Sequence, residues 1–164
     1  MRLLYLLMFV PFAATASEHY STSAGPQVAI QAYSRAAHLS PLSASGEDTL
    51  RVWTRDSMLG QVHGYIITKT TAKSCSAPSS YSDGSITVGR VRCSPSPRSA
   101  SVDKAIRALP SFSRQEWNCP AFDGGVVFIE GVRQHKYFAV RVGNPQVCDD
   151  PESKAIVELL GKLG

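Results

Sequence analysis

Four cysteines constrain the fold of this chain most strongly. Cys75, Cys93, Cys119 and Cys148 are the only cysteines among its 164 residues. An even number of cysteines in an exported protein is typical of disulfides, and four of them allow three pairings. We expect the sequential pairing, Cys75 with Cys93 and Cys119 with Cys148, because each pair brackets a plausible β-hairpin that would bring its two sulfurs close together.

The competing interpretations of these cysteines are a metal site and a catalytic thiol. Structural zinc sites use closely spaced ligands such as C-x-x-C, and the sequence has no such spacing and no histidine at ligand spacing from a cysteine. A reactive thiol needs an activating neighbour, and none is evident in the sequence. We therefore expect neither a metal nor a cofactor.

Residues 1–16 have the pattern of a secretory signal peptide. Arg2 precedes an apolar run over residues 3–16, which ends in the small-x-small sequence Ala14-Thr15-Ala16. The run is shorter than the roughly 20 residues that a membrane-spanning helix needs. We expect cleavage after Ala16, a periplasmic or secreted mature protein without a membrane span, and an oxidising setting for the cysteines.

The composition predicts one globular domain of modest charge. Apolar residues make up 43% and charged residues 18% of the chain, which excludes a disordered chain or a coiled coil. The formal net charge is only +4 and the basic residues are spread along the chain, so we expect no nucleic-acid partner. After a polar, flexible N-terminus over residues 17–25, residues 26–164 are predicted to form a single α+β domain.

Three helices are predicted from apolar residues that recur at three- and four-residue steps. The first covers residues 26–38 and begins with a proline. The second covers residues 102–109, after a serine cap at Ser99 or Ser101. The third covers residues 151–163, after an aspartate cap, and carries an apolar stripe of isoleucine and leucine.

Alternating and β-branched residues predict two hairpins. Residues 50–55 and 61–71 form the first, and residues 86–91 form a third strand after a tight turn at Asp83-Gly84. Residues 126–132 and 136–142 form the second hairpin. The expected fold class is α+β, with an antiparallel sheet of hairpins, two or three helices packed on one face, and two disulfides.

The register of the second hairpin depends on its tip. With Gln134 and His135 at the tip, one apolar face pairs Val127 with Val142, Ile129 with Val140 and Gly131 with Phe138. Glutamine followed by histidine is a poor tight-turn sequence, so the register could shift.

Glu130 is the most notable carboxylate, because its neighbours in sequence are apolar. One interpretation is an outward-facing ion pair with Arg141 or Arg133, worth under roughly 1 kcal/mol. The other is a general acid with a raised pKa, as glycoside hydrolysis requires, aided by His63 or an aspartate. We prefer the ion pair, since the sequence contains no recognised catalytic motif and specifies no partner for an acid.

Trp53, Arg55 and Asp56 are the predicted interaction residues. They lie at the end of a predicted strand, and aromatic residues beside arginine are common interface anchors. Burial in the core is the alternative for the tryptophan.

Several short motifs resemble those of small exported proteins of Gram-negative bacteria that have no assigned function. They lie within residues 47–164 and are Trp53-x-Arg55-Asp56, Gly60-x-Val62-x-Gly64, Asp123-Gly124-Gly125, Glu130-Gly131 and Asn144-Pro145-x-x-Cys148. The resemblance implies a periplasmic setting and supplies no catalytic residue.

Two functional hypotheses follow from the sequence. The first is a non-catalytic binding module, such as an inhibitor or an immunity protein, whose partner is a protein or a cell-envelope component. It combines a small disulfide-stabilised scaffold with the lack of a catalytic motif. The second is a small cell-envelope hydrolase that uses Glu130.

Overall fold

The structure is a computed structural model that describes residues 17–42, 47–56, 59–121 and 124–164. The predicted signal peptide lies outside the described residues, as does Asp123 of the glycine-rich turn. Within the described ranges, no helix combines the length and the apolar character needed to cross a membrane.

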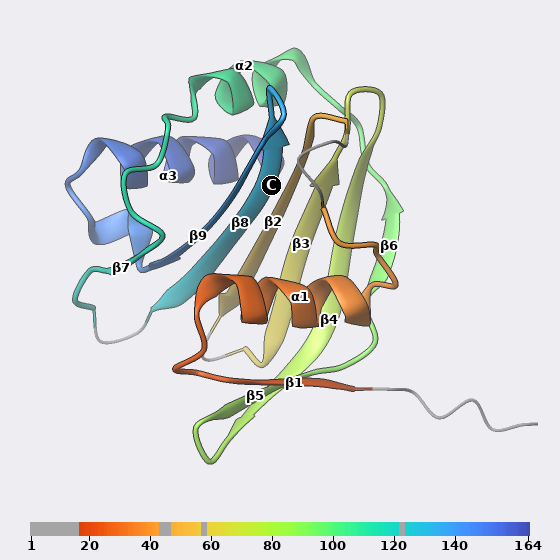
Figure 1. Ribbon diagram of the computed structural model, residues 1–164, viewed down its shortest axis with the longest axis vertical. Helices are drawn as coiled ribbons and strands as arrows, with labels where there is room; N and C mark the ends of the chain where they lie inside the picture. The colour runs from red at the N-terminus through yellow and green to blue at the C-terminus, as the bar shows by residue number, and fades with distance from the viewer. Residues whose placement is uncertain (1–16, 43–46, 57–58, 122–123) are drawn as a thin grey trace, which may run out of the picture.

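A curled sheet of nine described strands, antiparallel except for one pair, organises the fold (Figure 1). The strand order is β1-β5-β4-β3-β2-β8-β9-β7, and β6 pairs with β4 outside this path. Only β7 runs parallel to its neighbour, β9. The strands are β1 (Glu18–Ser21), β2 (Thr49–Asp56), β3 (Gln61–Ile67), β4 (Ala72–Ser82), β5 (Ser85–Val88), β6 (Arg92–Pro95), β7 (Glu116–Asn118), β8 (Gly125–Arg133) and β9 (Lys136–Gly143).

The three predicted helices are present, together with one 3₁₀ turn, η1 (Pro145–Val147). They are α1 (Pro26–Ala36), α2 (Ala100–Ala108) and α3 (Pro151–Leu163). The Ser99 hydroxyl accepts a hydrogen bond from the Val102 amide at the start of α2, and the Asp150 carboxylate accepts one from the Ser153 amide in α3. Each cap satisfies an amide that the helix itself leaves unpaired.

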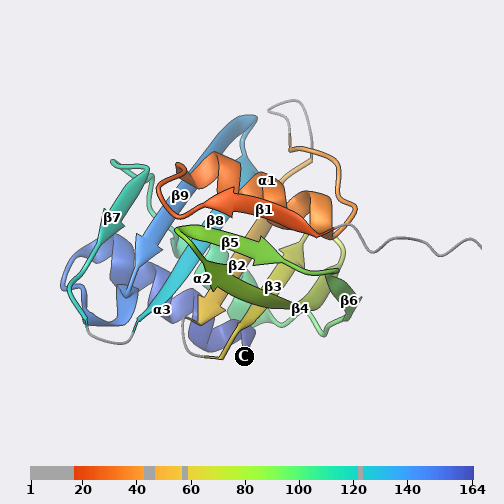
Figure 2. The same ribbon diagram turned by 90° about the horizontal axis from the view of Figure 1, so that it is seen from below.

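The helices cover both faces of the sheet, which differs from the prediction of helices on one face only. Figure 2 shows α1 on one side of the sheet and α2 and α3 on the other. Helix α1 packs in the core cluster that contains Trp53 and Phe128, whereas α2 and α3 share the second cluster with Val52 and Ile129. Neighbouring residues of β2 and β8 are therefore buried on opposite faces, so both faces need a cover.

The predicted register of the β8–β9 hairpin is confirmed. Val127 pairs with Val142, Ile129 with Val140 and Gly131 with Phe138. The tight turn at Asp83-Gly84 also forms, and both of its residues have positive φ.

Two stretches differ from the sequence-based assignment. Glu18–Ser21 forms the edge strand β1, paired with β5, where the composition indicated a flexible start. Its only buried residue, Tyr20, enters the core and exchanges a hydrogen bond with the Tyr33 hydroxyl of α1 at 2.5 Å. The predicted strand over residues 61–71 ends at Ile67, and the chain turns there into the long strand β4.

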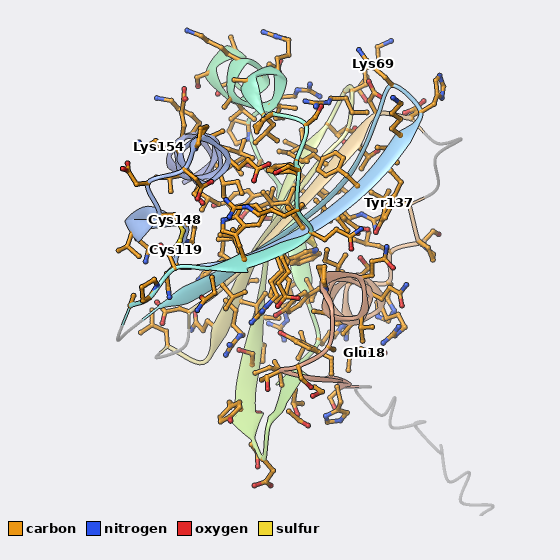
Figure 3. The ribbon with its side chains drawn as sticks, turned by 60° about the vertical axis from the view of Figure 1, so that its left-hand side comes forward. Glu18, Lys69, Cys119, Tyr137, Cys148 and Lys154 are labelled. Carbon is orange, nitrogen blue, oxygen red and sulfur yellow. A yellow bond between two sulfur atoms is a disulfide. The ribbon has the colours of Figure 1, made fainter. Side chains whose placement is uncertain are left out.

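Both disulfides have the expected sequential pairing. Cys75 and Cys93 lie directly opposite each other on β4 and β6, with their Cα atoms 4.0 Å apart. Cys119 follows β7 and bonds to Cys148 after η1, as the yellow sulfur atoms show (Figure 3). Among the described residues, one group has metal-ligand spacing, and it consists of this second disulfide and Asp150. Its sulfurs are bonded to each other and offer no thiolate to a metal.

Candidate functional site

Trp53 is a core residue, which corrects its prediction as an interaction anchor. Its side chain is fully buried and stacks on Tyr33 of α1, with the ring centroids 5.5 Å apart. The ring lies over Gly64 on β3, where a Cβ atom would come within 2.3 Å of it. The sequence pattern missed this burial because Arg51 and Arg55, two positions to either side of Trp53, share its sheet face and made that face appear polar.

The other two predicted interaction residues lie nearer the surface. Arg55 is half-buried and lines a small hollow together with Arg141. Asp56 is exposed, and its carboxylate accepts a hydrogen bond from the Leu59 amide at 3.1 Å. With Trp53 buried, these two residues no longer form part of an aromatic anchor.

Glu130 lies in the interior, not on an outward face as the sequence suggested. Only 4% of the residue is exposed, and Oε1 accepts hydrogen bonds from Arg51 at 3.0 Å and from the Ser34 hydroxyl at 3.1 Å. Its ion-pair partner is therefore Arg51, directly opposite on β2. The two predicted partners are engaged elsewhere, Arg141 with Glu116 and Arg133 with the carbonyl oxygens of residues 109 and 110.

The structure does not bring Glu130 and His63 together. Glu130 shares a sheet face with Phe128 and the α1 residue Ser34, whereas His63 alternates with Val62 and Gly64 and so faces the opposite side. His63 is exposed there. An acid–base pair needs both groups on one reacting centre, so the geometry gives no support to the predicted hydrolase site.

Tyr137 completes the polar cluster around Glu130, because its hydroxyl donates to Oε2 at 3.4 Å. Burial, and then the nearby carboxylate of Glu130, raise the pKa of Tyr137 to about 12. The folded protein therefore holds this proton at pH values where an unfolded tyrosine, with a pKa near 10, loses it. The stability contributed by this group is present below about pH 10 and is lost as the pH rises towards 12.

Tyr137→Phe should reduce the loss of stability at alkaline pH. The wild-type free energy of unfolding should fall more steeply between about pH 10 and 12 than that of the variant, because only the wild type carries this proton linkage. Urea denaturation over this range measures the two slopes. Tyr81→Phe, at an exposed position of β4, is the control. Equal slopes for wild type and Tyr137→Phe would contradict the linkage.

A cleft of about 640 Å³ lies at the end of the sheet next to α2. It is bounded by α2, by the turn between β3 and β4, by the start of β2 and by the tip of the β8–β9 hairpin. Figure 3 labels Lys69 at this end of the molecule. The lining residues are Glu47, Asp48, Thr49, Leu50, Ile67, Thr68, Lys69, Arg98, Asp103, Ile106, Arg107, Leu109, Val132, Arg133, Gln134, His135 and Phe138.

Part of the cleft rim is basic and is formed by α2 and the β3–β4 turn. Arg98 links these two elements, because it donates to the Thr68 carbonyl oxygen and to the Asp103 carboxylate. Lys69 follows Thr68, and Arg107 lies one helical turn after Asp103 on the same face of α2. Arg98 and Asp103 neutralise each other, and Lys69 and Arg107 add positive charge to this part of the rim.

Carboxylates lie at the start of β2, between the β3–β4 turn and the hairpin tip. Asp48 precedes β2 and accepts a hydrogen bond from the Gln134 amide at 3.1 Å, and Glu47 is its exposed neighbour. Gln134 and His135 have φ values of 53° and 60°. This left-handed conformation is unfavourable for non-glycine residues, by about 1–2 kcal/mol each. The hairpin therefore keeps two strained residues at the rim of the cleft, a feature common at functional sites.

Replacement of Gln134 and His135 by asparagine and glycine should stabilise the protein. Asn-Gly is the preferred sequence for a two-residue turn with positive φ at both positions, so the double variant should gain about 1–2 kcal/mol in the free energy of unfolding. Chemical denaturation measures the gain. Asp83→Asn, in a turn that already ends in glycine, is the matched control and should change little. A double variant no more stable than wild type would show that the turn is unstrained.

Most of the cleft residues carry no direct signal in the sequence. Lys69, Arg107 and Glu47 lie on three separate segments, and only the folded topology places them around one opening. The one available signal was the Gln134-His135 tip of the hairpin. A turn sequence that is poor for stability but is kept at a fixed register indicates that these residues serve a function.

The function of this protein is therefore inferred from the chemistry of the cleft. Its floor is apolar, charged groups of both signs line its rim, and its volume lies within the usual range of about 300–1,000 Å³ for small-ligand sites. Comparison of the chain with protein-family models, with curated proteins and with solved structures found no match.

Proposed function

We propose that this protein is an exported, non-catalytic binding module that holds a protein or a cell-envelope component in the cleft beside α2. The observation that carries the proposal is the cleft itself. Half-buried Ile106 and Phe138 form part of its apolar floor, and charged groups of both signs surround them. Apolar contact with a few placed polar groups is the usual composition of a binding site.

Export is supported by two features that are independent of the cleft. Residues 1–16 have the charge, apolar run and small-residue end of a signal peptide. The two disulfides are of the kind that persists in oxidising compartments such as the periplasm. A periplasmic binding module of this size fits the role of an inhibitor or an immunity protein.

The positions of the acidic and basic groups favour a binding function over a catalytic one. Glu130 does not line the cleft and is engaged by Arg51, Ser34 and Tyr137. Of the half-buried charges in the cleft, Arg98 and Asp103 are paired with each other, and Arg133 is bound to backbone carbonyl oxygens. These groups hold the wall of the cleft in place, which suits the binding of a ligand.

Retention of envelope components by variants of the cleft tests the proposal. Protein purified from the periplasm is immobilised and exposed to periplasmic extract and to solubilised cell-wall fragments, and retained species are identified by mass spectrometry. Ile106→Trp fills the cleft and should abolish retention, while Val157→Trp on the exposed side of α3 should keep it. Circular dichroism checks that both variants are folded.

Two outcomes would overturn the proposed function. One is equal retention by wild type and Ile106→Trp, which would place the partner elsewhere. The other is cleavage of cell-wall glycan by the wild type that Glu130→Gln abolishes, which would favour the hydrolase hypothesis instead.

A further inference from the structure

We infer that the small hollow lined by Arg55 and Arg141 binds an oxyanion, such as a phosphate or a carboxylate group. This site goes beyond the proposed function, because the hollow and the cleft share no lining residue. The cleft lies at the start of β2, and the hollow lies near its end, on the face of the sheet that α1 covers.

The strand register brings the two arginines to one place. Arg55 of β2 lies opposite Val126 of β8, and Arg141 of β9 lies opposite Phe128 of the same strand. Val126 and Phe128 are two positions apart, so both of them and both arginines share one sheet face. All four residues line the hollow, which therefore receives two cationic side chains from strands on either side of β8.

Arg55 brings a positive charge that has no counter-charge. Its side chain is half-buried, and within the described parts of the chain it makes no ion pair. Its Nε atom is buried and has no hydrogen-bond partner there. A buried N–H without an acceptor is unfavourable in a folded protein. An oxyanion in the hollow supplies both the acceptor and the opposite charge.

Arg141 adds a second cation with donors to spare. Its Nη1 atom pairs with Glu116, and a guanidinium has further N–H groups that this single contact does not use. Among the described residues that line the hollow, none is acidic. Two guanidiniums without a carboxylate between them are suited to an anion, which accepts charge-assisted hydrogen bonds from both.

Tyr20 offers a third donor at the same hollow. Its hydroxyl is 2.5 Å from that of Tyr33, and when Tyr33 donates to Tyr20, the proton of Tyr20 is free for a ligand. Burial raises the pKa of Tyr20, so the hydroxyl keeps its proton at neutral pH. Arg55 and Arg141 act in the opposite direction, as positive charges close to the hydroxyl do.

The size of the hollow limits what enters it. Its volume is about 10 Å³, which is room for about one water-sized atom. One oxygen of an oxyanion therefore fits between the donors, and the rest of the ligand stays at the mouth. The bound group is either a free ion or the end of a larger molecule, and the probes below distinguish these two sources.

The Arg55 Nε–H resonance tests the inference directly. The ¹⁵N-labelled full exported protein is titrated with inorganic phosphate, methyl phosphate and acetate, each at the same ionic strength in a chloride background. The resonance is identified by its absence from the spectrum of Arg55→Met. We expect it to shift to saturation, and phosphate to bind more tightly than acetate because it carries more charge.

Variants assign the binding to the hollow. Arg55→Met should weaken phosphate binding about tenfold or more, as expected for loss of a charge-assisted hydrogen bond, with the backbone amide of Val126 as the reporter. Arg55→Lys keeps the charge without the Nε–H group and should give a smaller loss. Arg92→Met, at an exposed position of β6 outside the hollow, is the control and should bind phosphate as the wild type does. Circular dichroism checks that the variants are folded.

The probes also identify the bound group. Equal responses to phosphate and methyl phosphate would show that the site accepts the end of a larger molecule, and a response to phosphate alone would restrict it to the free ion. The strongest response to acetate would identify a carboxylate. No saturable shift with any probe, or equal phosphate binding by wild type and Arg55→Met, would overturn the oxyanion site and leave the proposed function of the cleft untouched.

Discussion

Replacement of Glu130 by alanine is expected to lower the free energy of unfolding by about 3–5 kcal/mol. The side chains of Arg51 and Glu130 are only 7% and 5% exposed, so the substitution leaves a guanidinium buried without its counter-charge. The Ser34 hydroxyl of α1 loses its acceptor at the same time. Urea denaturation at neutral pH measures the loss.

Matched variants separate the buried charge from other effects. Glu116→Ala breaks the more exposed pair with Arg141 and should cost less than about 1 kcal/mol. The double variant Arg51→Met, Glu130→Leu should recover most of the stability, because removal of both charges leaves no unpaired ion in the core. A Glu130→Ala variant as stable as Glu116→Ala would contradict the structural role of this pair.

The same experiment separates the two functional hypotheses. A catalytic Glu130 predicts a neutral substitution for stability and a total loss of glycan cleavage in Glu130→Gln. The buried ion pair predicts a large loss of stability, because the neutral amide leaves the Arg51 charge uncompensated.

Removal of the Cys119–Cys148 disulfide should have an effect of similar size. The cysteines are 29 residues apart, and in the chain-entropy model a loop of this length contributes about 3–4 kcal/mol. The bond joins the segment after β7 to the segment before α3, so its loss also frees the end of the sheet that α3 covers. The double variant Cys119→Ala, Cys148→Ala avoids new buried hydroxyl groups, and its denaturation midpoint gives the change.

The second disulfide provides the comparison. Cys75 and Cys93 are 18 residues apart, so their double alanine variant should lose slightly less stability, about 3 kcal/mol. A chain whose denaturation midpoint is the same with and without reducing agent would contradict a stabilising role for both bonds.

Local features of the fold could be predicted from the sequence because neighbouring residues decide them. The caps at Ser99 and Asp150 precede apolar residues at helical spacing. The register of β8 and β9 follows from a tip that leaves Val127 opposite Val142, and a slip of one residue would turn the apolar side chains to the wrong face. The Cys75–Cys93 disulfide joins residues that are opposite each other on paired strands.

Features that depend on distant segments could not be predicted. Glu130 pairs with Arg51, which is 79 positions away in sequence, and nothing near either residue indicates the other. One face of β2 and β8 carries both apolar and charged residues, so the sequence did not indicate that α1 covers that face. The cleft could not be predicted for the same reason, because its lining residues come from segments that meet only in the folded protein.

An NMR titration tests the central claim most directly. The ¹⁵N-labelled protein is titrated with the component it retains from the cell envelope, and shifts of backbone amides are mapped onto the chain. The account predicts that the largest shifts fall on cleft residues, including Thr68, Arg107 and His135. Shifts centred instead on the β4–β5 hairpin, with the cleft amides unmoved, would contradict it.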